Sequence, residues 1–565
     1  MLTETTDYAR LRRDFRWNVP EHFNIGTATV DKHADGSGKL ALIDVGADGR
    51  AKNYSFDELK TLSNRFANVL KADGLARGDR VAVFLSQSVE LPVVHLAAFR
   101  SGLISVPLFT LFGEDALEFR LTDSETKAIV TDEGGLEKLA QIRERVPDLK
   151  HIYVVGEHAP AGTKSFRKAI EAASDQFTPA ITRADDPAII VYTSGTTGNP
   201  KGALHAHRML LGHLPNIQMC HDFLPKPADV YWTPADWAWI GGLFNALFPA
   251  WYFGVPIVAS RARKFEPQAA IRLMADHRIR NVFFPPTALK LMRQAGVSGE
   301  GVNLRSIISG GESLGAELLD WVRATFRIDV HEIFGQTECN LCVGNNAKLF
   351  PIKPGSMGRA IPGFDVRVLD DDGNELPNGT TGGIGIHRST ASTMLEYWKN
   401  PEATRAKFTK DFLMTGDLGR RDDDGHFWYV SREDDVITSA GYRIGPAEIE
   451  NTLIKHPAVA IAAVVGIPDP IRTESVKAWI VLRPGFAPSN ALAQEIQEFV
   501  KVHLSAHEYP RHVAFTDSLP MTATSKVIRR ELRARAHSLR ASRSTPSPAT
   551  PAGSPCWSPS SAANP

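Results

Sequence analysis

Short apolar runs alternate with helical segments over much of the chain, and this alternation constrains the fold most. Between residues 40 and 135, buried strands are indicated by the runs 80–85, 104–108 and 128–131. Ser55, followed three residues later by Glu58, opens one of the intervening helices with a capping signal. Strands and helices in alternation form parallel sheets that are covered on both faces. We therefore predict a doubly wound α/β domain.

The same alternation resumes beyond residue 200, and several of its strands end in unusual loops. Strand runs and the loops that follow them are 188–191 before a Ser/Thr/Gly turn, 304–309 before Gly310-Gly311-Glu312, and 330–333 before Phe334-Gly335-Gln336. In open α/β sheets, ligands bind beyond the carboxyl ends of the strands. We therefore expect these loops to face one crevice.

The pattern changes after residue 353. Residues 353–431 contain short runs and turns, which are typical of a small β subdomain. Residues 434–537 form a compact α+β pattern, with strands expected near 459–466 and 476–482. From Ser538 onward Ser, Pro, Ala and Thr predominate, a composition that buries too little surface to offset the entropy of ordering. We predict a large domain over 1–433, a small domain over 434–537 and a disordered tail over 538–565.

Composition argues against several classes of protein. Basic and acidic residues number 64 each, so nothing favours nucleic acid as a partner. The four cysteines fit a reducing compartment, and Cys339-x-x-Cys342 lacks the second pair of a metal site, so we interpret both as pocket-lining thiols.

Residues 1–16 do not form a secretory signal. Gly and Pro interrupt the uncharged stretch 239–259, which favours a buried helix and strand over a membrane span. We expect a soluble, cytoplasmic protein without a redox cofactor.

The turn that follows the run 188–191 suits a polyphosphate. It presents hydroxyls, backbone N–H groups and one ammonium group at a single point, in the order Thr193-Ser194-Gly195-Thr196-Thr197-Gly198-Asn199-Pro200-Lys201. The commonest phosphate loop places lysine directly after its second glycine, whereas here Asn199 and Pro200 intervene. Ordinary turns are also rich in these residue types, but an uninterrupted string of this kind is hard to obtain that way. We interpret the stretch as a triphosphate clamp.

This string resembles the phosphate-binding signature of the adenylate-forming superfamily, which includes acyl-CoA synthetases, adenylation domains of peptide synthetases and luciferases. Further strings occur in the family's order up to about Ala536, and residues 439–446 are most similar to the medium-chain acyl-CoA synthetases. The resemblance implies a large N-terminal domain, a mobile C-terminal lid, and ATP, Mg²⁺ and CoA as cosubstrates. The reaction it implies converts a carboxylic acid to an acyl-adenylate and then to an acyl-CoA, with AMP and diphosphate as products.

The resemblance also implies roles for single residues of the large domain. The phosphates would contact Thr193, Ser194, Gly195, Thr196, Thr197, Gly198 and Lys201. Mg²⁺ would bind Glu338 and Thr196, because a hard cation prefers oxygen ligands. The nucleoside would contact Gly311, Glu312, Ser313, Phe334, Gly335, Gln336, Thr337, Asp417 and Arg432. Phe334 would stack on adenine, and Asp417 with Arg432 would bind the ribose hydroxyls.

The lid would contribute a third catalytic residue beside Lys201 and Glu338. Lys526 would bridge the attacking carboxylate and the α-phosphate, although Ser525 stands where the family usually has glycine. A protein lysine acetyltransferase acting on Lys526 would stop adenylation by removing its charge. Asp434 would be the hinge. CoA would contact Ser439, Gly441, Tyr442, Arg443 and Tyr509, with Gly441 lining the pantetheine tunnel.

The acid would lie in a pocket lined by Trp237, Trp239, Ile240, Gly241, Gly335 and Cys339. In acetyl-specific relatives a tryptophan closes this pocket directly before the Gln-Thr-Glu string, whereas this chain has Gly335. Each buried methylene of a longer acid could contribute about 0.8 kcal/mol. We therefore predict an acid larger than acetate, a medium-chain or branched fatty acid.

Three other functions compete with this one. An aryl-CoA ligase acting on a benzoate-like acid would differ only in pocket shape and is kept as an alternative. A carrier-protein-coupled adenylating enzyme is less favoured, because a low-complexity tail rather than a carrier domain follows Lys526. A non-catalytic nucleotide-binding regulator should lack Lys526 or Glu338, and both are present.

Overall fold

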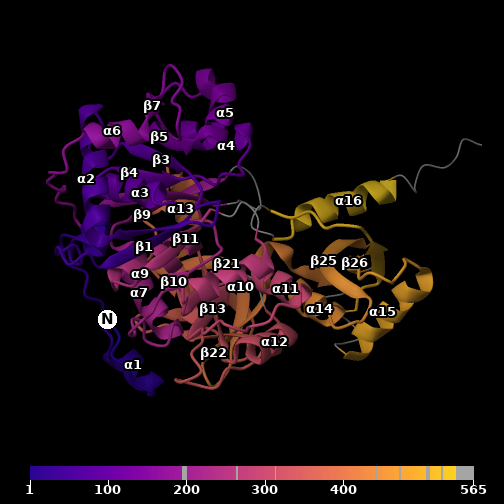
Figure 1. Ribbon diagram of the computed structural model, residues 1–565. Coiled ribbons are helices and arrows are strands. Elements are labelled where there is room, and N and C mark those ends of the chain that lie inside the picture. Colours follow the sequence, from indigo (N-terminus) through magenta and orange to yellow (C-terminus); the bar gives the residue numbers. More distant parts are fainter. Residues whose placement is uncertain are drawn as a thin grey trace, which may run out of the picture. The chain divides into compact units, whose positions relative to one another are not determined.

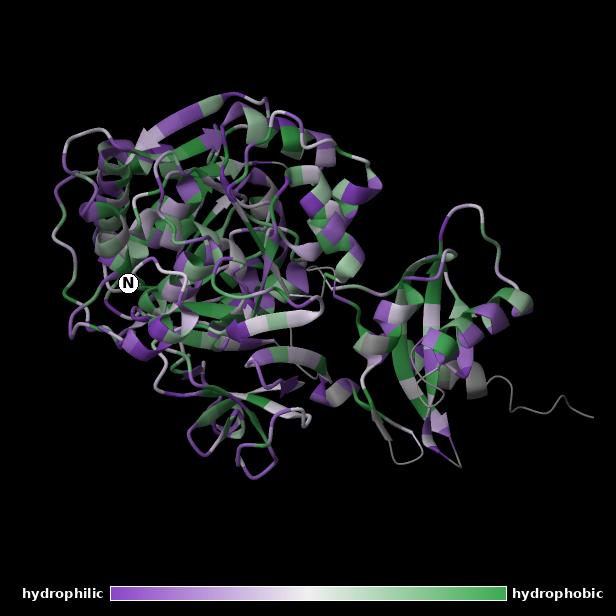
Figure 2. Ribbon diagram, turned by 90° about the horizontal axis from the view of Figure 1, so that it is seen from below, coloured by the Kyte–Doolittle hydropathy of each residue, from purple (hydrophilic) through white to green (hydrophobic). Residues whose placement is uncertain are grey.

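The computed structural model describes residues 1–193, 200–261, 265–311, 314–439, 442–469, 472–503, 509–522 and 526–541 (Figure 1). Its contacts divide the chain into two compact units, Met1–Asp434 and Asp435–Pro565. In Figure 2, hydrophobic segments concentrate on the inner strands and helices of the larger unit, and hydrophilic segments on its outer loops. Each unit has hydrophobic cores of its own.

The first sheet of the N-terminal unit has a parallel interior, as the alternating pattern predicts. Its strands lie in the order β19-β9-β8-β4-β3-β5-β6-β7. Their bounds are β3 (Arg80–Phe84), β4 (Ile104–Pro107), β5 (Thr126–Asp132), β6 (His151–Val155), β7 (Lys164–Ser165), β8 (Pro187–Thr193), β9 (Lys201–Ala206) and β19 (Glu396–Tyr397). All neighbours from β8 to β7 pair in parallel, whereas β8 with β9 and β9 with β19 are antiparallel.

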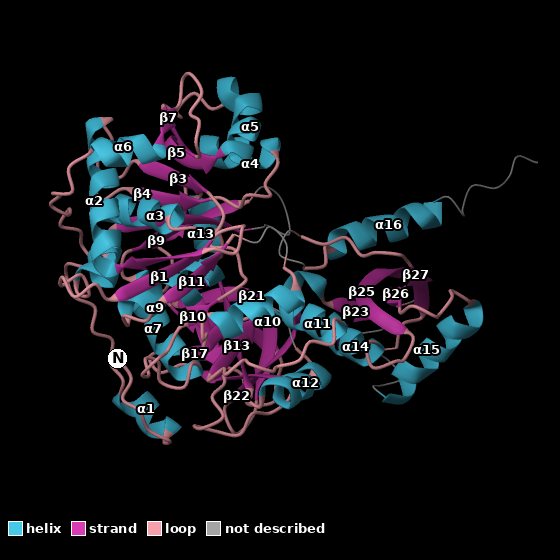
Figure 3. Cartoon of the chain, viewed as in Figure 1, coloured by secondary structure: helices cyan, strands magenta, loops and turns pink. Residues whose placement is uncertain are grey.

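Helices cover both faces of this sheet, because successive side chains of a strand point to opposite sides. Val81 and Val83 of β3 share a core with α2 (Phe56–Ala72) and α3 (Glu90–Arg100). Ala82 and Phe84 share another with α4 (Glu114–Asp123) and α5 (Glu133–Ile142). Figure 3 shows α2, α3 and α6 (Phe166–Ala172) on one side and α4 and α5 on the other. The predicted capping box of α2 is confirmed, with Ser55 and Glu58 bonded reciprocally.

The second sheet contains a parallel half, from β14 to β1, that continues the alternating pattern. Its order is β17-β18-β21-β22-β16-β15-β14-β13-β12-β10-β11-β1-β2. The strands of this half and its edge are β1 (Leu40–Val45), β2 (Ala51–Ser55), β10 (Tyr231–Trp232), β11 (Ile257–Ser260), β12 (Asn281–Phe283), β13 (Ser306–Gly310), β14 (Val330–Gln336) and β15 (Asn340–Gly344). One correction is needed, since β14 continues through Phe334, Gly335 and Gln336, which the sequence placed in the following loop.

Two layers of helices enclose this half of the sheet. The outer helices α10 (Pro267–Asp276), α11 (Pro286–Gln294) and α12 (Ala316–Phe326) share a core with Val282 and Ile307. The inner helices α7 (Met209–Cys220) and α9 (Phe248–Tyr252) share the core that α2 and α3 form under the first sheet. Every residue of α7 is buried. The inner helices therefore form a central layer between the two sheets.

The uncharged stretch 239–259 folds as a buried helical segment followed by a strand, as predicted. It contains α8 (Ile240–Gly242), the π-helical turn η3 (Leu243–Leu247), α9 and most of β11. Within the described part of the chain, no helix has the length and apolarity that a membrane crossing requires.

Antiparallel strands dominate the region 353–431. They are β16 (Ser356–Ala360), β17 (Val366–Leu369), β18 (Gly382–His387), β20 (Phe408–Thr409), β21 (Phe412–Arg421) and β22 (His426–Arg432), with α13 (Pro401–Ala406) between β19 and β20. Antiparallel pairing of β15 with β16 joins them to the parallel half of the second sheet. The long β21–β22 hairpin therefore extends the sheet that carries β14.

The C-terminal unit has its own sheet and two cores. Its strands are β23 (Ile437–Ser439), β24 (Tyr442–Ile444), β25 (Val459–Asp469), β26 (Thr473–Leu482) and β27 (His512–Phe515). One face packs against α14 (Pro446–Leu453) and α15 (Asn490–His503), and the other against α16 (Arg529–Ala541). Helix α16 runs to Ala541 and so includes the first residues of the predicted disordered tail, 538–541. The rest of that tail, 542–565, lies outside the described residues.

Candidate active site

The predicted triphosphate clamp is the turn of the β8–β9 hairpin. Thr193 ends β8, Lys201 begins β9, and the two lie opposite each other. The Thr193 hydroxyl donates to the Lys201 carbonyl oxygen at 3.3 Å. The turn residues Ser194, Gly195, Thr196, Thr197 and Gly198 lie outside the described residues. Antiparallel pairing therefore fixes the Lys201 backbone at the base of the predicted clamp.

The other predicted phosphate-site residue, Glu338, follows β14 and is 8% exposed. Its Oε1 accepts a hydrogen bond from the Tyr397 hydroxyl at 2.6 Å. The Lys201 ammonium nitrogen lies 5.3 Å from the centroid of the same tyrosine ring. Burial, reinforced by the Glu338 carboxylate, raises the pKa of Tyr397, so its hydroxyl stays protonated. The structure thus brings Lys201 and Glu338 to one tyrosine that the sequence analysis did not single out.

The predicted ribose pair also meets. Asp417 of β21 and Arg432 of β22 are opposite residues of the hairpin. Arg432 Nη1 lies 3.1 Å from Asp417 Oδ1. The Thr415 carbonyl oxygen accepts from Arg432 Nη1 at 3.3 Å and from Gln336 Nε2 at 3.0 Å. This shared acceptor ties the end of β14 to the β21–β22 hairpin, so three of the predicted nucleoside contacts are linked.

The predicted adenine loop begins where β13 ends. Gly311 has a φ of +102°, a left-handed conformation that glycine adopts without strain. Glu312 and Ser313 lie outside the described residues. The backbone N–H of Leu314 donates to Glu332 Oε1 at 3.3 Å. Glu332, 8% exposed on β14, is a second residue that the sequence analysis missed, and burial raises its pKa to about 7.

Phe334, the predicted adenine platform, lies on β14 two residues after Glu332 and is partly buried against the main core. Thr337 follows the end of β14 at Gln336, and the Gln336 carbonyl accepts a bond from the backbone N–H of Cys339 at 3.3 Å. The backbone from Phe334 to Thr337 is therefore set by β14 and the turn after it.

The predicted acyl-pocket residues lie on both sides of the β14–β15 turn and around α8. A Cβ atom on Gly335 would lie 1.9 Å from the Asn340 carbonyl oxygen, so a tryptophan there would require the β15 backbone to move. Trp239 packs on Phe109 and Phe112, with centroid distances of 5.4 and 6.2 Å.

The remaining predicted wall residues differ in burial. Trp237 and Cys339 are fully buried, whereas Ile240 and Gly241 are partly buried. A Cβ atom on Gly241 would approach the Phe283 ring to 2.9 Å. Close packing therefore favours glycine at this position.

Cys339 and Cys342 are free and buried, and burial raises the pKa of Cys342. Among the described residues, no group of three His, Cys, Asp or Glu side chains could hold a metal ion. Mg²⁺ needs no such group when it binds one carboxylate together with substrate phosphates and water. A single buried carboxylate beside the clamp, as Glu338 is, fits that requirement.

The C-terminal unit carries the predicted lid residues. Lys526 is exposed; its backbone N–H donates to the Thr522 hydroxyl, and its carbonyl oxygen accepts from the Thr522 N–H. Ser439 is buried at the end of β23, and the Tyr509 hydroxyl accepts from Arg511 at 2.7 Å. Backbone positions in β24 are occupied by Tyr442 and Arg443, whereas Gly441 lies outside the described residues.

The predicted hinge, Asp434, is the last residue of the N-terminal unit. It belongs to the short 3₁₀ helix η4 (Glu433–Asp435), which follows β22 directly. Arg432, the predicted ribose contact, therefore lies two residues before the unit boundary.

Comparison with known proteins decides the family. Residues 30–398 match the model of the AMP-binding enzyme family, and residues 448–526 match that of the AMP-binding enzyme C-terminal domain. The chain belongs to the AMP-binding enzyme family. The predicted membership of the adenylate-forming superfamily is therefore confirmed.

Several relatives match at least 90% of this AMP-binding enzyme. Acetyl-coenzyme A synthetase of Bacillus subtilis is 36% identical over 521 residues, which are 90% of each chain. The mitochondrial acyl-coenzyme A synthetase ACSM3 of Mus musculus is 35% identical over 94% of this chain and 93% of its own. The crystal structure of the anthranilate CoA ligase AuaEII with anthranoyl-AMP aligns with a TM-score of 0.84 at 28% identity, covering 93% and 99% of the two chains. The predicted fold class is confirmed.

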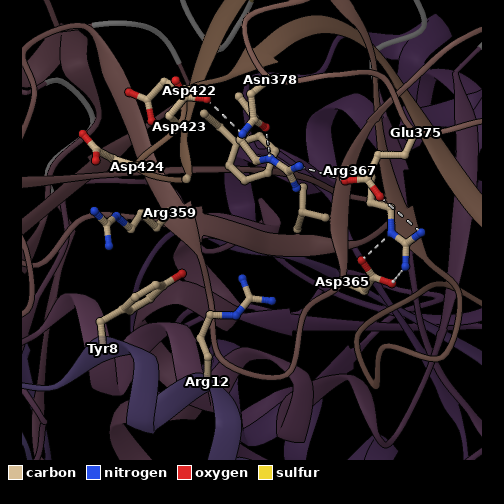
Figure 4. A pocket seen from close by; sticks show the side chains of 14 residues that line it. Tyr8, Arg12, Arg359, Asp365, Arg367, Glu375, Asn378, Asp422, Asp423 and Asp424 are labelled. Carbon is tan, nitrogen blue, oxygen red and sulfur yellow. Dashed lines mark hydrogen bonds and ion pairs between the residues drawn. The ribbon is translucent and has the colours of Figure 1, made fainter.

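A cavity of about 460 Å³ in this AMP-binding enzyme is lined in part by residues of β17, β21 and β22 (Figure 4). Its lining consists of Tyr8 and Arg12 of α1 (Tyr8–Asp14) and of residues 359, 365–367, 375, 378, 421–425 and 427, none of which is a predicted site residue. Its charges pair internally, for example Arg367 with Asp365 at 2.8 Å and Arg421 with Glu375 at 2.9 Å. The first pair lies at the start of β17, and the second ties the end of β21 to the loop between β17 and β18.

Proposed function

We propose that this AMP-binding enzyme is an AMP-forming acyl-CoA synthetase that acts on an acid larger than acetate. The observation that carries the reaction class is similarity over at least 90% of the chain to an acetyl-coenzyme A synthetase and to an acyl-coenzyme A synthetase. ATP and CoA are its cosubstrates. The residue roles, the cation and the identity of the acid extend that conclusion.

The first half-reaction forms the acyl-adenylate. A carboxylate oxygen of the acid bonds to the α-phosphorus of ATP, and the bond from that phosphorus to the diphosphate oxygen breaks. Most of the catalytic task is electrostatic, because the leaving diphosphate carries high charge. Lys201 and the turn residues 193–198 would hold the β- and γ-phosphates. Glu338 and Thr196 would hold Mg²⁺, which when bound neutralises phosphate charge.

The nucleoside would be held by the residues that the β14 end and the β21–β22 hairpin bring together. Asp417 would accept hydrogen bonds from the ribose hydroxyls, and such charge-assisted bonds are strong. Arg432, bonded to Asp417, would keep that carboxylate in place. Phe334, held in β14, would stack on adenine, and Gly311 would let the backbone approach the base closely.

The second half-reaction transfers the acyl group to CoA. The CoA thiolate attacks the acyl carbon, a C–S bond forms, and AMP leaves with the carboxylate oxygen. Lys526 would serve only the first step, bridging the acid and the α-phosphate. Rotation of the C-terminal unit at Asp434 would then replace Lys526 by the CoA-binding residues, among them Gly441 and Tyr509. Exposure of Lys526 also makes it accessible to a protein lysine acetyltransferase.

Two classes of carboxylic acid are candidates for the substrate. A medium-chain or branched fatty acid is the first candidate. The Asn340 backbone fills the Cβ side of Gly335, so the acyl chain would lie against the other predicted wall residues and not in space left by a missing indole. The packing of Trp239 on Phe109 and Phe112 gives the predicted pocket an aromatic wall, which favours a benzoate-like acid as the second candidate. The free, buried cysteines fit a reducing compartment, and we propose the cytoplasm.

A panel of acids tests the proposal. Purified enzyme with ATP and Mg²⁺ would be assayed for AMP and diphosphate, with and without CoA, on acetate, straight-chain, branched and aromatic acids. We expect diphosphate release with at least one acid larger than acetate, and acyl-CoA only when CoA is present. Preference for acetate would contradict the proposed acid size, and no diphosphate with any acid would contradict the reaction.

A further inference from the structure

A short segment, Met394–Trp398, connects strand β9 to the loop that carries Glu338. The backbone N–H of Met394 donates to the Glu338 carbonyl oxygen at 2.8 Å, and that of Trp398 donates to the Gly202 carbonyl oxygen at 2.7 Å. Within this segment, Tyr397 of β19 lies opposite Ala203 of β9. The Tyr397 backbone is therefore fixed relative to both predicted phosphate-site residues, one on each side.

The Tyr397 side chain contacts both of these residues. It is 4% exposed and packs on Ala203, Met394 and Ala403. Its hydroxyl donates to Oε1 of Glu338 at 2.6 Å, and its ring lies 5.3 Å from the Lys201 ammonium nitrogen. Among the residues that the structure describes, Oε2 of Glu338 has no hydrogen-bond partner. One carboxylate oxygen is thus engaged by the phenol, and the other is left for a ligand.

We propose that Tyr397 is a positioning residue that orients the Glu338 carboxylate towards a divalent cation and holds the Lys201 ammonium group beside it. This inference rests on the proposed function, in which Glu338 and Lys201 act on the phosphates of ATP. Partners of metal-binding side chains commonly fix their orientation. The face of an aromatic ring attracts an ammonium group, so one side chain places both charges.

A purely structural role is the competing explanation, because a buried tyrosine hydroxyl needs an acceptor wherever it lies. The chain offers a matched control in Tyr153 of β6, which is fully buried and donates to the Asp73 carboxylate. Tyr153 has no part in the predicted site. If Tyr397 were only structural, removing either hydroxyl would have similar consequences.

The variants Tyr397→Phe and Tyr153→Phe separate these explanations. Phenylalanine keeps the ring, and with it the packing and the contact to Lys201, but removes the donor to Glu338. We expect Tyr397→Phe to weaken binding of Mn²⁺-ATP, measured by calorimetry without acid or CoA, about tenfold or more. The Mg²⁺ concentration that half-saturates diphosphate release should rise by a similar factor, with the KM for CoA unchanged. Tyr153→Phe should change neither metal measurement.

Tyr397→Leu provides a second comparison, because it also removes the ring beside Lys201. We expect its KM for ATP to exceed that of Tyr397→Phe. The melting temperature of every variant is measured as a control. If the wild-type protein is active and Tyr397→Phe has the same Mn²⁺-ATP affinity and half-saturating Mg²⁺ concentration, the inference is overturned. A lowered melting temperature with normal Mn²⁺-ATP binding would do the same, since it would show a structural role alone. If the wild-type protein neither bound Mn²⁺-ATP nor released diphosphate, the proposed function itself would fail.

Discussion

Glu332 provides a sharp test of how the site is supported, because it is a buried acid that bonds to the backbone beside the predicted adenine loop. Its Oε1 accepts from the Leu314 N–H, and its Oε2 is buried without a hydrogen-bond partner among the described residues. In Glu332→Gln, the amide oxygen can still accept from Leu314. The substitution therefore removes the ability to ionise while it keeps this hydrogen bond.

The magnitude follows from the pKa. Burial raises the pKa of Glu332 from 4.5 to about 7, so between these values the folded protein keeps a proton that the unfolded chain releases. The free energy of unfolding of the wild type then falls as pH rises from 4.5 to 7, by up to about 3 kcal/mol. Glutamine carries no such dependence. The stability advantage of Glu332→Gln should be near zero at pH 4.5 and complete above pH 7.

Melting temperatures at pH 5 and pH 8 measure this difference. A unit of the size of Met1–Asp434 has an unfolding entropy of about 0.9 kcal/mol/K, so the variant should melt roughly 3 °C above the wild type at pH 8. At pH 5 the two should nearly coincide. Glu300→Gln, at an exposed glutamate, is the control and should show no pH-dependent gain. A gain of equal size at both pH values, or a variant that melts lower at pH 8, would refute the reasoning.

Three other predictions concern the predicted catalytic lysine and the packing of each unit. Lys526→Ala should lower diphosphate release about a hundredfold or more but spare acyl-CoA formation from supplied acyl-adenylate; equal loss of both steps would contradict its role. Gly335→Ala should destabilise the N-terminal unit by about 1–3 kcal/mol, because its Cβ would meet the Asn340 carbonyl oxygen; an unchanged melting temperature would exclude this contact. Arg529→Ala should destabilise the C-terminal unit by about 1–3 kcal/mol, because it removes a two-bond partner of the partly buried Glu450 carboxylate. Limited proteolysis should detect that loss, and wild-type resistance would contradict it.

The parts of this structure that follow from local patterns were predictable. Strands such as β3 and β12 are apolar runs within an alternating pattern, and the cap of α2 lies in one short string. The end of β14 was not predictable from local pattern. Gly335 and Gln336 do not favour a strand by themselves, and they belong to β14 because they pair with β15. Helix α16 extends into the predicted disordered tail, because Leu539, Arg540 and Ala541 favour helix.

The site divides in the same way. The sequence could single out Lys201, Glu338, Asp417 and Arg432 as candidates, because they lie in distinctive strings. Tyr397 could not, since its contact with Glu338 spans 59 positions and nothing in its surroundings distinguishes it from a core tyrosine. The role of Glu332 likewise depends on burial between neighbouring strands, and burial is decided by the whole fold.

The hairpin connection between β8 and β9 has a consequence for how this protein manages negative charge. Many nucleotide sites place phosphate at the start of a helix, where the helix dipole supplies a fixed partial positive charge. Here the chain continues after the turn as strand β9. Within the described residues, the element that follows the turn therefore offers it no helix N-terminus. In the proposed phosphate site, the charge of the nucleotide would therefore be neutralised largely by bound cations and ammonium groups, and nucleotide affinity should fall at high ionic strength and on any modification that discharges a single lysine.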